Sequence, residues 1–559
     1  MSASFPILII ALLAPRLVIA QNPDWSSDVK ITEPRANIYS WAPADLENYK
    51  TQGKLHAQVY PVTVTGVLPP YRPIRRLIEE QNTNPFRKWI QNILHETTGY
   101  YRFVDLLKHL GLHDYPGSND TGVYSAPYPK ELFHAEELMG FGVIKYKGAE
   151  GFTFSCAACH TSNLFGKTVL GMTNRFPRAN EFFIKAKKVV TATDPYLFQT
   201  YTGATDTERE MYAMSREHLQ SVGLKHPQAL GLDTSLAQVA LSLNRRAKDG
   251  YASYHTHFQA HPRADVYLDD QPADSKPAVW WNLKYKNRWL SDGSVLSGNP
   301  IFTNIIWNEI GRGVDLVKLE KWLSENQKTI DELTTAVFSS EAPLITDFIP
   351  AEKIDLGRAK LGEEVFKNNC AKCHGHYDKA WSQPGSEALP LKDQLKTVQV
   401  RYKEKTPVVD VGTDPYRRIG MKSLEQLNDL SISKTNNIVI KAQDGYVPPP
   451  LVGIWARWPY FHNNSAPTLC AVLTRAEERP KTYYSGHAND VERDFDFECN
   501  GYPTGAKIPK AWQTPAHFFD TSRKGMSNSG HDQKIFIKDG KEILSAEDKR
   551  NLVLFLQTL

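Results

Sequence analysis

Two short stretches of the chain repeat one chemically distinctive pattern, Cys-x-x-Cys-His. Residues 156–160 read CAACH and residues 370–374 read CAKCH, so four of the six cysteines occur in this spacing. Two thiols in this spacing can each form a thioether to one porphyrin, and the adjacent imidazole can bind its iron. The residues are Cys156, Cys159 and His160 in the first motif, and Cys370, Cys373 and His374 in the second. The pattern predicts two covalently bound haem c groups, each iron bound by its motif's histidine.

Other chemistries of paired cysteines fit these stretches less well. A dithiol redox motif needs no histidine and would lie in a thioredoxin-like βαβ unit, which the sequence lacks. A zinc site would require two further Cys or His ligands at finger or ribbon spacing. Haem attachment is therefore the interpretation that accounts for every residue of both motifs.

The elements expected around the two motifs differ. Before the second motif, Ala359, Gly362 and Phe366 recur at helical spacing, which predicts an amphipathic helix leading to Cys370. The last residues, LSAEDKRNLVLFLQTL, predict a closing helix capped by Ser545. Its apolar stripe comprises Leu552, Val553, Leu556 and Leu559. We expect these two helices to clasp the second haem, whereas the first motif follows a glycine-rich stretch with strand-like alternation.

Two further features concern export. Residues 5–20 form an apolar run that ends in a small-x-small pattern before Gln21, which predicts a signal peptide over residues 1–20. A buried strand or a retained membrane anchor is the alternative. An exported protein would be periplasmic or secreted, with no stable membrane span after cleavage. There the remaining Cys470 and Cys499 are expected to form a disulfide, with two buried free thiols as the alternative.

Composition and linkers indicate how the chain is divided. Its 559 residues are 41% hydrophobic and 23% charged with a net charge of +4, which is typical of a globular protein and gives no reason to expect nucleic-acid binding. We expect a loop-rich extension over residues 21–129, with a helical stretch near its end. Two haem domains are expected over residues 130–345 and 352–559. The predicted fold class is mainly α, with two cytochrome c-like domains, long loops and a few short strands.

Several stretches resemble a known family. Residues 447–469 (VPPPLVGIWARWPYFHNNSAPTL) resemble a segment of bacterial di-haem cytochrome c peroxidases and their relatives. Residues 478–486, 519–531 and 279–295 are similar to the branch that contains rubber oxygenases and related di-haem oxidoreductases. This resemblance implies a reactive N-terminal haem with an open iron face and a six-coordinate C-terminal haem for electron transfer. It also implies that His531 is the sixth ligand of the second haem, with Met526 or Met421 as alternatives, and that His462 lies near that haem, with a purely structural role as the alternative.

The surroundings of the reactive iron would decide the reaction. Peroxide cleavage requires a general base and a charge-stabilising group, whereas oxygen insertion into an apolar substrate requires an apolar pocket. The resemblance suggests Trp280, Trp281, Leu296 and Phe302 as distal-pocket residues, although the two tryptophans could be core residues instead. His134, Glu136 and Glu137 precede the first motif, but they fit a helical turn with a solvated acidic face equally well. No clear distal histidine or glutamate is thus identified, which favours the oxygenase-like reaction.

The leading hypothesis is therefore an exported di-haem oxidoreductase that activates O2 or H2O2 at the N-terminal haem. An oxygenase-like enzyme would act on a small or polymeric apolar substrate. The first alternative is a di-haem cytochrome c peroxidase supplied with electrons by a redox partner protein. The second is a non-enzymatic electron carrier with two six-coordinate haems, and a sensor or structural module is a further one.

Overall fold

The computed structural model describes residues 23, 25, 35–79, 84–129 and 138–559, and within them helices predominate over strands. The predicted signal peptide lies outside the described residues, as do His134, Glu136 and Glu137. Residues 35–345 are here called the first region, and its described residues form the α-helices α1 Pro43–Val59, α2 Tyr71–Glu79, α3 Pro85–Thr98, α4 Phe103–His109, α5 Ala179–Ala192, α6 Pro195–Thr202, α7 Asp206–Gln220, α8 Ser235–Leu243, α9 Thr256–Ala260, α10 Pro300–Ile310, α11 Leu316–Glu325 and α12 Gln327–Phe338.

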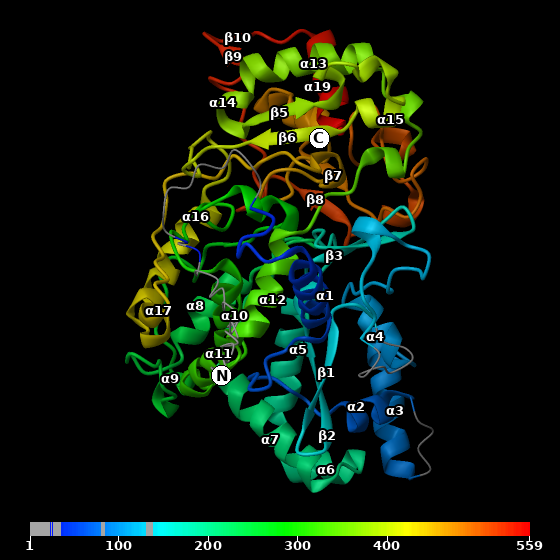
Figure 1. Cartoon of the computed structure of the whole chain (residues 1–559). Coiled ribbons are helices and arrows are strands. Elements are labelled where there is room, and N and C mark those ends of the chain that lie inside the picture. Colours follow the sequence, from blue (N-terminus) through cyan, green and yellow to red (C-terminus); the bar gives the residue numbers. More distant parts are fainter. Residues whose placement is uncertain (1–22, 24, 26–34, 80–83, 130–137) are drawn as a thin grey trace, which may run out of the picture.

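Residues 352–559, the second region, contain shorter helices joined by long loops. They are α13 Leu356–Asn369, α14 Ala371–His374, α15 Leu391–Gln394, α16 Tyr416–Gly420, α17 Ser431–Thr435, α18 Leu469–Val472 and α19 Ala546–Gln557. Figure 1 shows α13, α14, α15 and α19 of the second region at one end of the molecule and helices α2, α3 and α6 at the other, with α16 and α17 between these ends.

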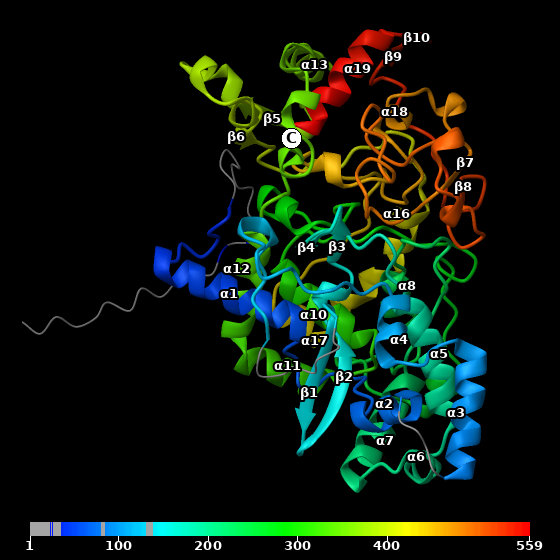
Figure 2. The ribbon, with the colours of Figure 1, turned by 90° about the vertical axis from the view of Figure 1, so that its right-hand side faces the viewer.

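The strands of the described residues form two-stranded antiparallel sheets, so no large sheet organises the fold. The first region has β1 Phe141–Tyr146 with β2 Ala149–Phe154, and β3 Thr161–Leu164 with β4 Lys167–Leu170. The second has β5 His376–Lys379 with β6 Thr397–Arg401, β7 Thr482–Tyr484 with β8 Phe518–Asp520, and β9 Ile537–Lys538 with β10 Lys541–Glu542. Figure 2 shows the β1–β2 hairpin as a long twisted ribbon, and β2 contacts α2 and α7. The expected mixture of helices, short strands and long loops is confirmed.

The helix pair predicted around the second motif is present. Asp355 accepts a hydrogen bond from the backbone N–H of Arg358 at the start of α13, and Ser545 forms a capping box with Asp548 at the start of α19. A Cβ on Gly362 would lie 2.0 Å from the Asn551 carbonyl oxygen, so glycine allows the two backbones to touch. Phe366 and Phe555 meet beside this contact, with ring centroids 5.2 Å apart.

The first region is also held by a close helix pair, which the sequence did not reveal. Helices α1 and α12 contact each other along their lengths, and a Cβ on Gly53 would lie 2.0 Å from the Glu332 carbonyl oxygen. Helices α1 and α2 lie in the part of residues 21–129 that was expected to be loop-rich, whereas α3 and α4 lie in the helical stretch expected near its end. Helix α1 buries only Gly53, Ala57 and Gln58, so it has no apolar stripe for periodicity to reveal.

Each of the two main core clusters contains residues from both regions. Residues 421–440 belong to the second region, yet Leu427 and Ile432 are buried in the core cluster that contains α8, α10 and α12. In return, Val169 and Trp281 of the first region are buried in the cluster that contains α13 and α19. In Figure 1, α17 accordingly lies beside α8 and α10. The regions therefore share packing, and the domain boundary stays a prediction. Among the described residues, none of the helices combines the length and apolar character that crossing a bilayer requires.

Candidate functional site: two haem-attachment motifs on one cavity

The first motif lies in a tight turn between the two hairpins of the first region. Cys156–Ala158 form one 3-10 turn after β2, and the His160 N–H donates to the Cys156 carbonyl at 3.1 Å. Asn174 fixes this turn: its side-chain amide donates to the Ala158 carbonyl at 2.8 Å, and its N–H donates to the Cys159 carbonyl at 3.0 Å. The turn places both thiols and the imidazole on the wall of one cavity.

The His160 imidazole is held in the orientation that an iron ligand requires. Its Nδ1 lies 2.8 Å from the Ala278 carbonyl, so Nδ1 carries the proton and Nε2 remains available. Burial lowers the pKa of His160 below its usual value, which favours the neutral imidazole that binds metal. The Trp280 ring packs beside it, with centroids 5.9 Å apart.

The second motif repeats this arrangement on a helix. Cys370 ends α13, α14 continues to His374, and the His374 N–H donates to the Cys370 carbonyl at 3.0 Å. The Nδ1 of His374 lies 2.8 Å from the Pro449 carbonyl. Burial again lowers the pKa of His374. In both histidines, Nδ1 therefore has the same kind of partner, a backbone carbonyl from a distant segment.

A second histidine faces His374. The His531 and His374 ring centroids are 6.2 Å apart. Two imidazoles whose nitrogens each lie about 2 Å from one metal ion have ring centroids roughly 6 Å apart. Burial, followed by the proximity of His374, lowers the pKa of His531 to about 3, and its Nδ1 is buried without a hydrogen-bond partner. This pair fits a metal between the two rings.

The methionine alternatives lie elsewhere. Met526 is 1% exposed in the core cluster of the second region. Met421 is fully buried in the core cluster of the first. Among the described residues that line the cavity there is no methionine. The geometry thus brings His531, and neither methionine, to the second motif.

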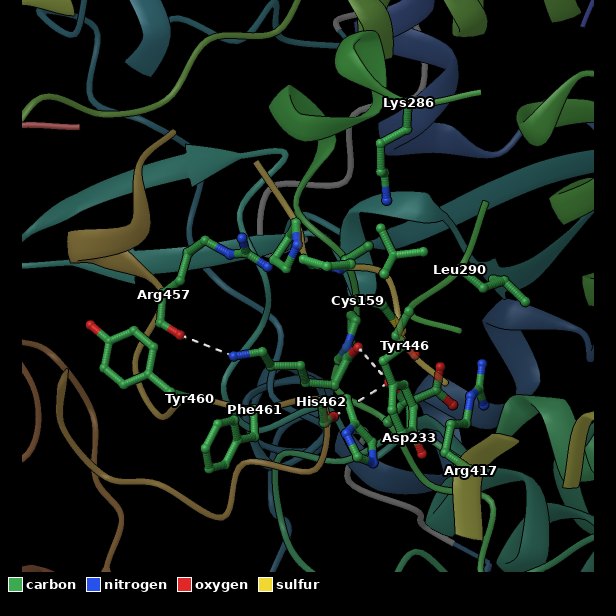
Figure 3. Close-up of a pocket in the computed structure, with 18 of the residues that line it drawn as sticks. Cys159, Asp233, Lys286, Leu290, Arg417, Tyr446, Arg457, Tyr460, Phe461 and His462 are labelled. Carbon is green, nitrogen blue, oxygen red and sulfur yellow. Dashed lines mark hydrogen bonds between the residues drawn. The ribbon is translucent and has the colours of Figure 1, made fainter. Parts of the chain in front are cut away.

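One continuous cavity of about 500 Å³ contains both motifs. Figure 3 draws part of its wall, with Cys159 of the first motif and Phe461 and His462 of the second region around the same space. Among the described residues, no group of three or more His, Cys, Asp or Glu could hold a metal ion by itself, so neither motif completes a zinc site.

Cationic side chains, some buried and some half-buried, line the cavity between the motifs. They are Lys276, Lys286, Arg417 and Arg457. Burial lowers the pKa of Lys286 to about 8 and that of Arg457 to about 10, and it holds the pKa of Lys276 well below its usual range. Burying a cation without an anion is unfavourable, so a negatively charged group in the cavity would stabilise this arrangement.

The partners of these cations within the protein are few. Lys276 donates to the Arg457 and Pro459 carbonyls, and Nε and Nη1 of Arg457 are buried without a hydrogen bond. The Arg417 Nε is 3.6 Å from Asp292, which does not line the cavity. The carboxylates of haem propionates have the charge and hydrogen-bonding capacity that this set lacks. The residues present therefore fit the group that the two motifs imply.

His462 lies on the same wall. Its ring stacks on Tyr446 with centroids 4.1 Å apart, and its Nε2 is buried without a partner. Burial, followed by the charges of Arg417 and Lys276, lowers its pKa to about 3. This placement agrees with the position implied by the resemblance, among the cations between the two motifs.

The four suggested distal-pocket residues are not on the cavity wall among the described lining residues. Trp280 contacts His160. Trp281 is fully buried in the core cluster that contains α13 and α19, and its indole N–H donates to the Val452 carbonyl at 2.9 Å. Phe302 is buried in α10. Leu296 is half-buried, and its N–H donates to the Val439 carbonyl.

Sequence reasoning missed the residues that do form the wall. Trp307 lines the cavity five residues after Phe302 on the same helix, α10. Lys276, Lys286 and Arg457 could have been noticed as cations within aromatic or apolar stretches, where a charged side chain needs a specific partner. The predicted disulfide is confirmed, because Cys470 and Cys499 are bonded.

Comparisons with known proteins agree with this site. A family model described as "RoxA-like, cytochrome c-like" matches residues 445–484, which contain Pro449, Arg457 and His462. This match supports a cytochrome c relationship, and a cytochrome c-like domain implies covalently bound haem c. It covers only part of the second region, so a cytochrome c-like first domain stays a prediction.

Two proteins of Sinorhizobium fredii are similar over longer stretches. The uncharacterized protein y4iJ is 36% identical over 480 residues, covering 72% of this chain and 76% of that protein. The uncharacterized protein y4iM is 25% identical over 284 residues, covering 47% of this chain and 58% of that protein.

Proposed function

This chain belongs to the same family as the protein y4iJ, and from that premise we propose that it is an exported di-haem c-type oxidoreductase. One haem would be bound by Cys156, Cys159 and His160, and the other by Cys370, Cys373 and His374. The first iron would activate O2 or H2O2, and the second would transfer or store electrons. The haem relationship of residues 445–484 supports the oxidoreductase assignment.

The observation that carries the proposal is an asymmetry between the two histidines of the motifs. The His531 ring lies opposite the His374 ring, and their centroids are 6.2 Å apart. The cavity lining contains only two further histidines among the described residues, His160 itself and His462. Because His462 stacks on Tyr446, it does not pair with His160 as His531 does with His374. An iron held by His160 would therefore keep one face open to a small molecule.

The wall near the first motif favours an oxygenase-like reaction. Phe183, Leu236, Val239 and Trp307 contribute apolar surface from α5, α8 and α10. Gln238 is held by its own hydrogen bonds, accepting from Asn180 at 3.1 Å and donating to the Gly311 carbonyl at 2.6 Å. These side chains can exclude water and position an apolar substrate, and none of them can act as a general base at neutral pH.

The position of Arg312 on the cavity wall favours a peroxidase instead, because a cation near the iron could stabilise developing negative charge. Its guanidinium, however, donates to Glu309 at 3.1 Å, to Thr65 at 3.3 Å and to the Phe154 carbonyl at 2.8 Å. With these donors engaged, Arg312 positions the strand before Cys156 rather than a reacting oxygen. We therefore place the peroxidase second.

Access to the cavity supports a role for an external substrate. Asn304 lines the cavity and is exposed, and Asn308, one turn further along α10, is half-buried. The cavity therefore reaches the surface at α10, with Trp307 beside it, and also at Ala278 and Lys372, which line it and are exposed. When bound, the haem would supply the redox-active iron, and the chain's residues would exclude water and orient the substrate in front of it.

The test begins with the purified holoprotein. The mass of the denatured protein should increase by two haems, and CO added to the reduced protein should shift the absorption of one haem only. Oxygen uptake should then depend on an apolar polyisoprenoid, without an external reductant. Peroxide-dependent oxidation of reduced cytochrome c would instead support the peroxidase. The proposal would be contradicted if the denatured protein carried no covalent haem, or if CO changed the absorption of neither haem.

A pair of variants on α10 locates the reactive side. Trp307→Leu should change CO binding and oxygen uptake, because Trp307 lines the cavity. Phe302→Leu is the matched control, because Phe302 is equally buried in the same helix but is not among the lining residues. Equal effects of the two changes would contradict a reactive pocket at α10.

A further inference from the structure

We propose that Arg479 is the positioning residue that holds His531 opposite His374. This inference rests on the proposed function, in which His531 is the sixth ligand of the second haem. The feature concerned, here called the Arg479 brace, consists of the Arg479 guanidinium and the backbone carbonyls that it binds on two separate segments.

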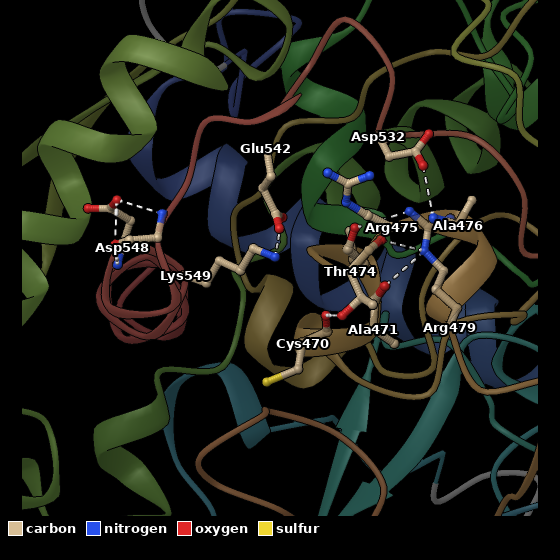
Figure 4. Close-up of polar contacts among 12 residues, drawn as sticks. Cys470, Ala471, Thr474, Arg475, Ala476, Arg479, Asp532, Glu542, Asp548 and Lys549 are labelled. Atoms are coloured by element: carbon tan, nitrogen blue, oxygen red, sulfur yellow. Dashed lines mark hydrogen bonds and ion pairs between the residues drawn. The ribbon is translucent and has the colours of Figure 1, made fainter. Parts of the chain in front are cut away.

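The brace joins two segments of the second region that are far apart in sequence. On one side, Nε of Arg479 donates to the Ala471 carbonyl at 2.9 Å and to the Thr474 carbonyl at 3.0 Å. On the other side, Nη1 donates to the carbonyls of Asn528 and Gly530, the latter at 2.7 Å. Figure 4 shows Arg479 between Ala471, Thr474 and the loop that carries Asp532.

Arg479 is suited to this task by its burial and by its planar set of donors. It is 2% exposed, and it forms no ion pair among those found in the described residues. Five N–H donors in a fixed plane can bind carbonyls on both sides at once, which a single ammonium group cannot do. The cation therefore serves as a connector between backbones and not as a charge partner.

The loop that the brace holds is the one that presents His531. Residues on both sides of His531 are fixed: Gly530 by Arg479, and Asp532 by accepting from the Ala476 N–H at 2.8 Å. His531 itself has a φ of +57°, which a residue with a side chain adopts only when its surroundings enforce it. Its N–H donates to the Val411 carbonyl at 2.8 Å.

The ring of His531 has little support of its own. Its Nδ1 has no hydrogen-bond partner, unlike the Nδ1 of His160 and His374, which each lie against a carbonyl. Phe461 contacts the His531 ring edge-on at 5.8 Å, and the Arg479 guanidinium covers Phe461 at 5.2 Å. Arg479 thus supports His531 twice, through the backbone of Gly530 and through the ring of Phe461.

The other end of the brace is anchored covalently. Ala471 lies in α18, next to Cys470, which is bonded to Cys499. The sixth ligand is therefore connected through Arg479 and α18 to a cross-linked part of the chain. This connection predicts that Arg479 determines how often His531 occupies its place opposite His374.

The experiment compares four variants of the holoprotein by their absorption and electron paramagnetic resonance spectra. Arg479→Gln should convert the second haem from low-spin to high-spin and allow it to bind CO, as His531→Ala should. Added imidazole should restore the low-spin signal in both. Arg479→Lys should show a partial loss. Arg475→Gln is the matched control, because Arg475 is in the same segment but its side chain, among the described residues, makes polar contacts only with Glu477 and the Gly540 carbonyl, at 3.9 and 3.4 Å.

The outcomes separate this inference from the proposed function. If His531→Ala becomes high-spin while Arg479→Gln stays low-spin with an unchanged midpoint potential, the positioning role is overturned and the ligand assignment stands. If His531→Ala itself stays low-spin, the ligand assignment fails. If Arg479→Gln does not retain both haems, the test rests on Arg479→Lys. A second haem in Arg479→Lys that stays low-spin and does not bind CO would overturn the inference.

Discussion

The two attachment motifs have the same local geometry but are built into different scaffolds. In each, the histidine N–H donates to the carbonyl of the first cysteine, and Nδ1 lies 2.8 Å from a distant carbonyl. The first motif lies in a turn between hairpins, whereas the second follows α13, which packs against α19. The pentapeptide therefore determines the turn, and the surrounding chain determines which side chains face its histidine. Among the described residues, only the second scaffold brings another histidine opposite the motif's own.

The largest expected effect comes from the close helix contacts in the two regions. Gly362→Val should separate α13 from α19, because a Cβ there would lie 2.0 Å from the Asn551 carbonyl oxygen. We expect a loss of about 3 kcal/mol or more in the free energy of unfolding and loss of the second haem's low-spin spectrum. Chemical unfolding and absorption spectra measure both.

Gly53→Val is the counterpart in the first region, with the same 2.0 Å approach to the Glu332 carbonyl oxygen. It should destabilise the protein by a similar amount while leaving the second haem low-spin. Gly357→Ala is the neutral control, because its Cβ would meet only the Asp355 side chain, at 3.3 Å. If Gly53→Val also removed the low-spin signal of the second haem, the second site would depend on the first region as well as on its own helices.

The disulfide should give the next largest effect, because only the second region contains one among the described residues. A cross-link between residues 29 apart stabilises a protein by about 3–4 kcal/mol, through the reduced entropy of the unfolded chain. Replacing both Cys470 and Cys499 with Ser should lower the free energy of unfolding by that amount. Wild-type protein treated with a thiol reductant is the control and should behave alike. An unchanged midpoint of unfolding would contradict the prediction.

A smaller, pH-dependent effect should arise where the regions meet. His113 of the first region lies near His487 of the second, and burial lowers its pKa to about 4. The folded protein therefore binds fewer protons than the unfolded chain between pH 6.5 and 4. The stabilising contribution of His113 is complete above about pH 6.5 and is lost as the pH falls towards 4, a change of roughly 3 kcal/mol.

Urea unfolding at pH 7 and pH 4.5 measures this contribution. His113→Gln, which cannot titrate, should lose less stability on acidification than the wild type does. His376→Gln is the control, because His376 is exposed on β5. Equal acid sensitivity of wild type and His113→Gln would contradict the assignment.

The smallest effect is expected at Trp280. Because this ring packs beside His160, Trp280→Phe should shift the midpoint potential of the first haem by a small amount, on the order of 20 mV, and leave the second unchanged. CO affinity should not change. A large change in CO affinity would place Trp280 on the open side of the iron, where the resemblance had suggested it.

Much of the second region could be predicted from the sequence because its signals are local. The spacing of Gly362 and Phe366 predicts the first of two helices and its contact, and the capping residue Ser545 predicts the second. Gly53 and Ala57 make an equally close contact in α1, but small residues leave no periodic pattern. Trp307 and Lys286 reach the cavity through tertiary packing, and no short-range rule connects them to residues 156–160.

The burial of the attachment thiols has a consequence for how the protein matures. Burial raises the pKa of Cys156 to about 11 and that of Cys370 to about 12, so the folded chain would present almost no thiolate. Among the described residues, Lys276, Lys286 and Arg457 of the cavity wall form no ion pair, whereas Arg417 lies near Asp292. We therefore expect a porphyrin to be attached before the chain has finished folding around the two motifs.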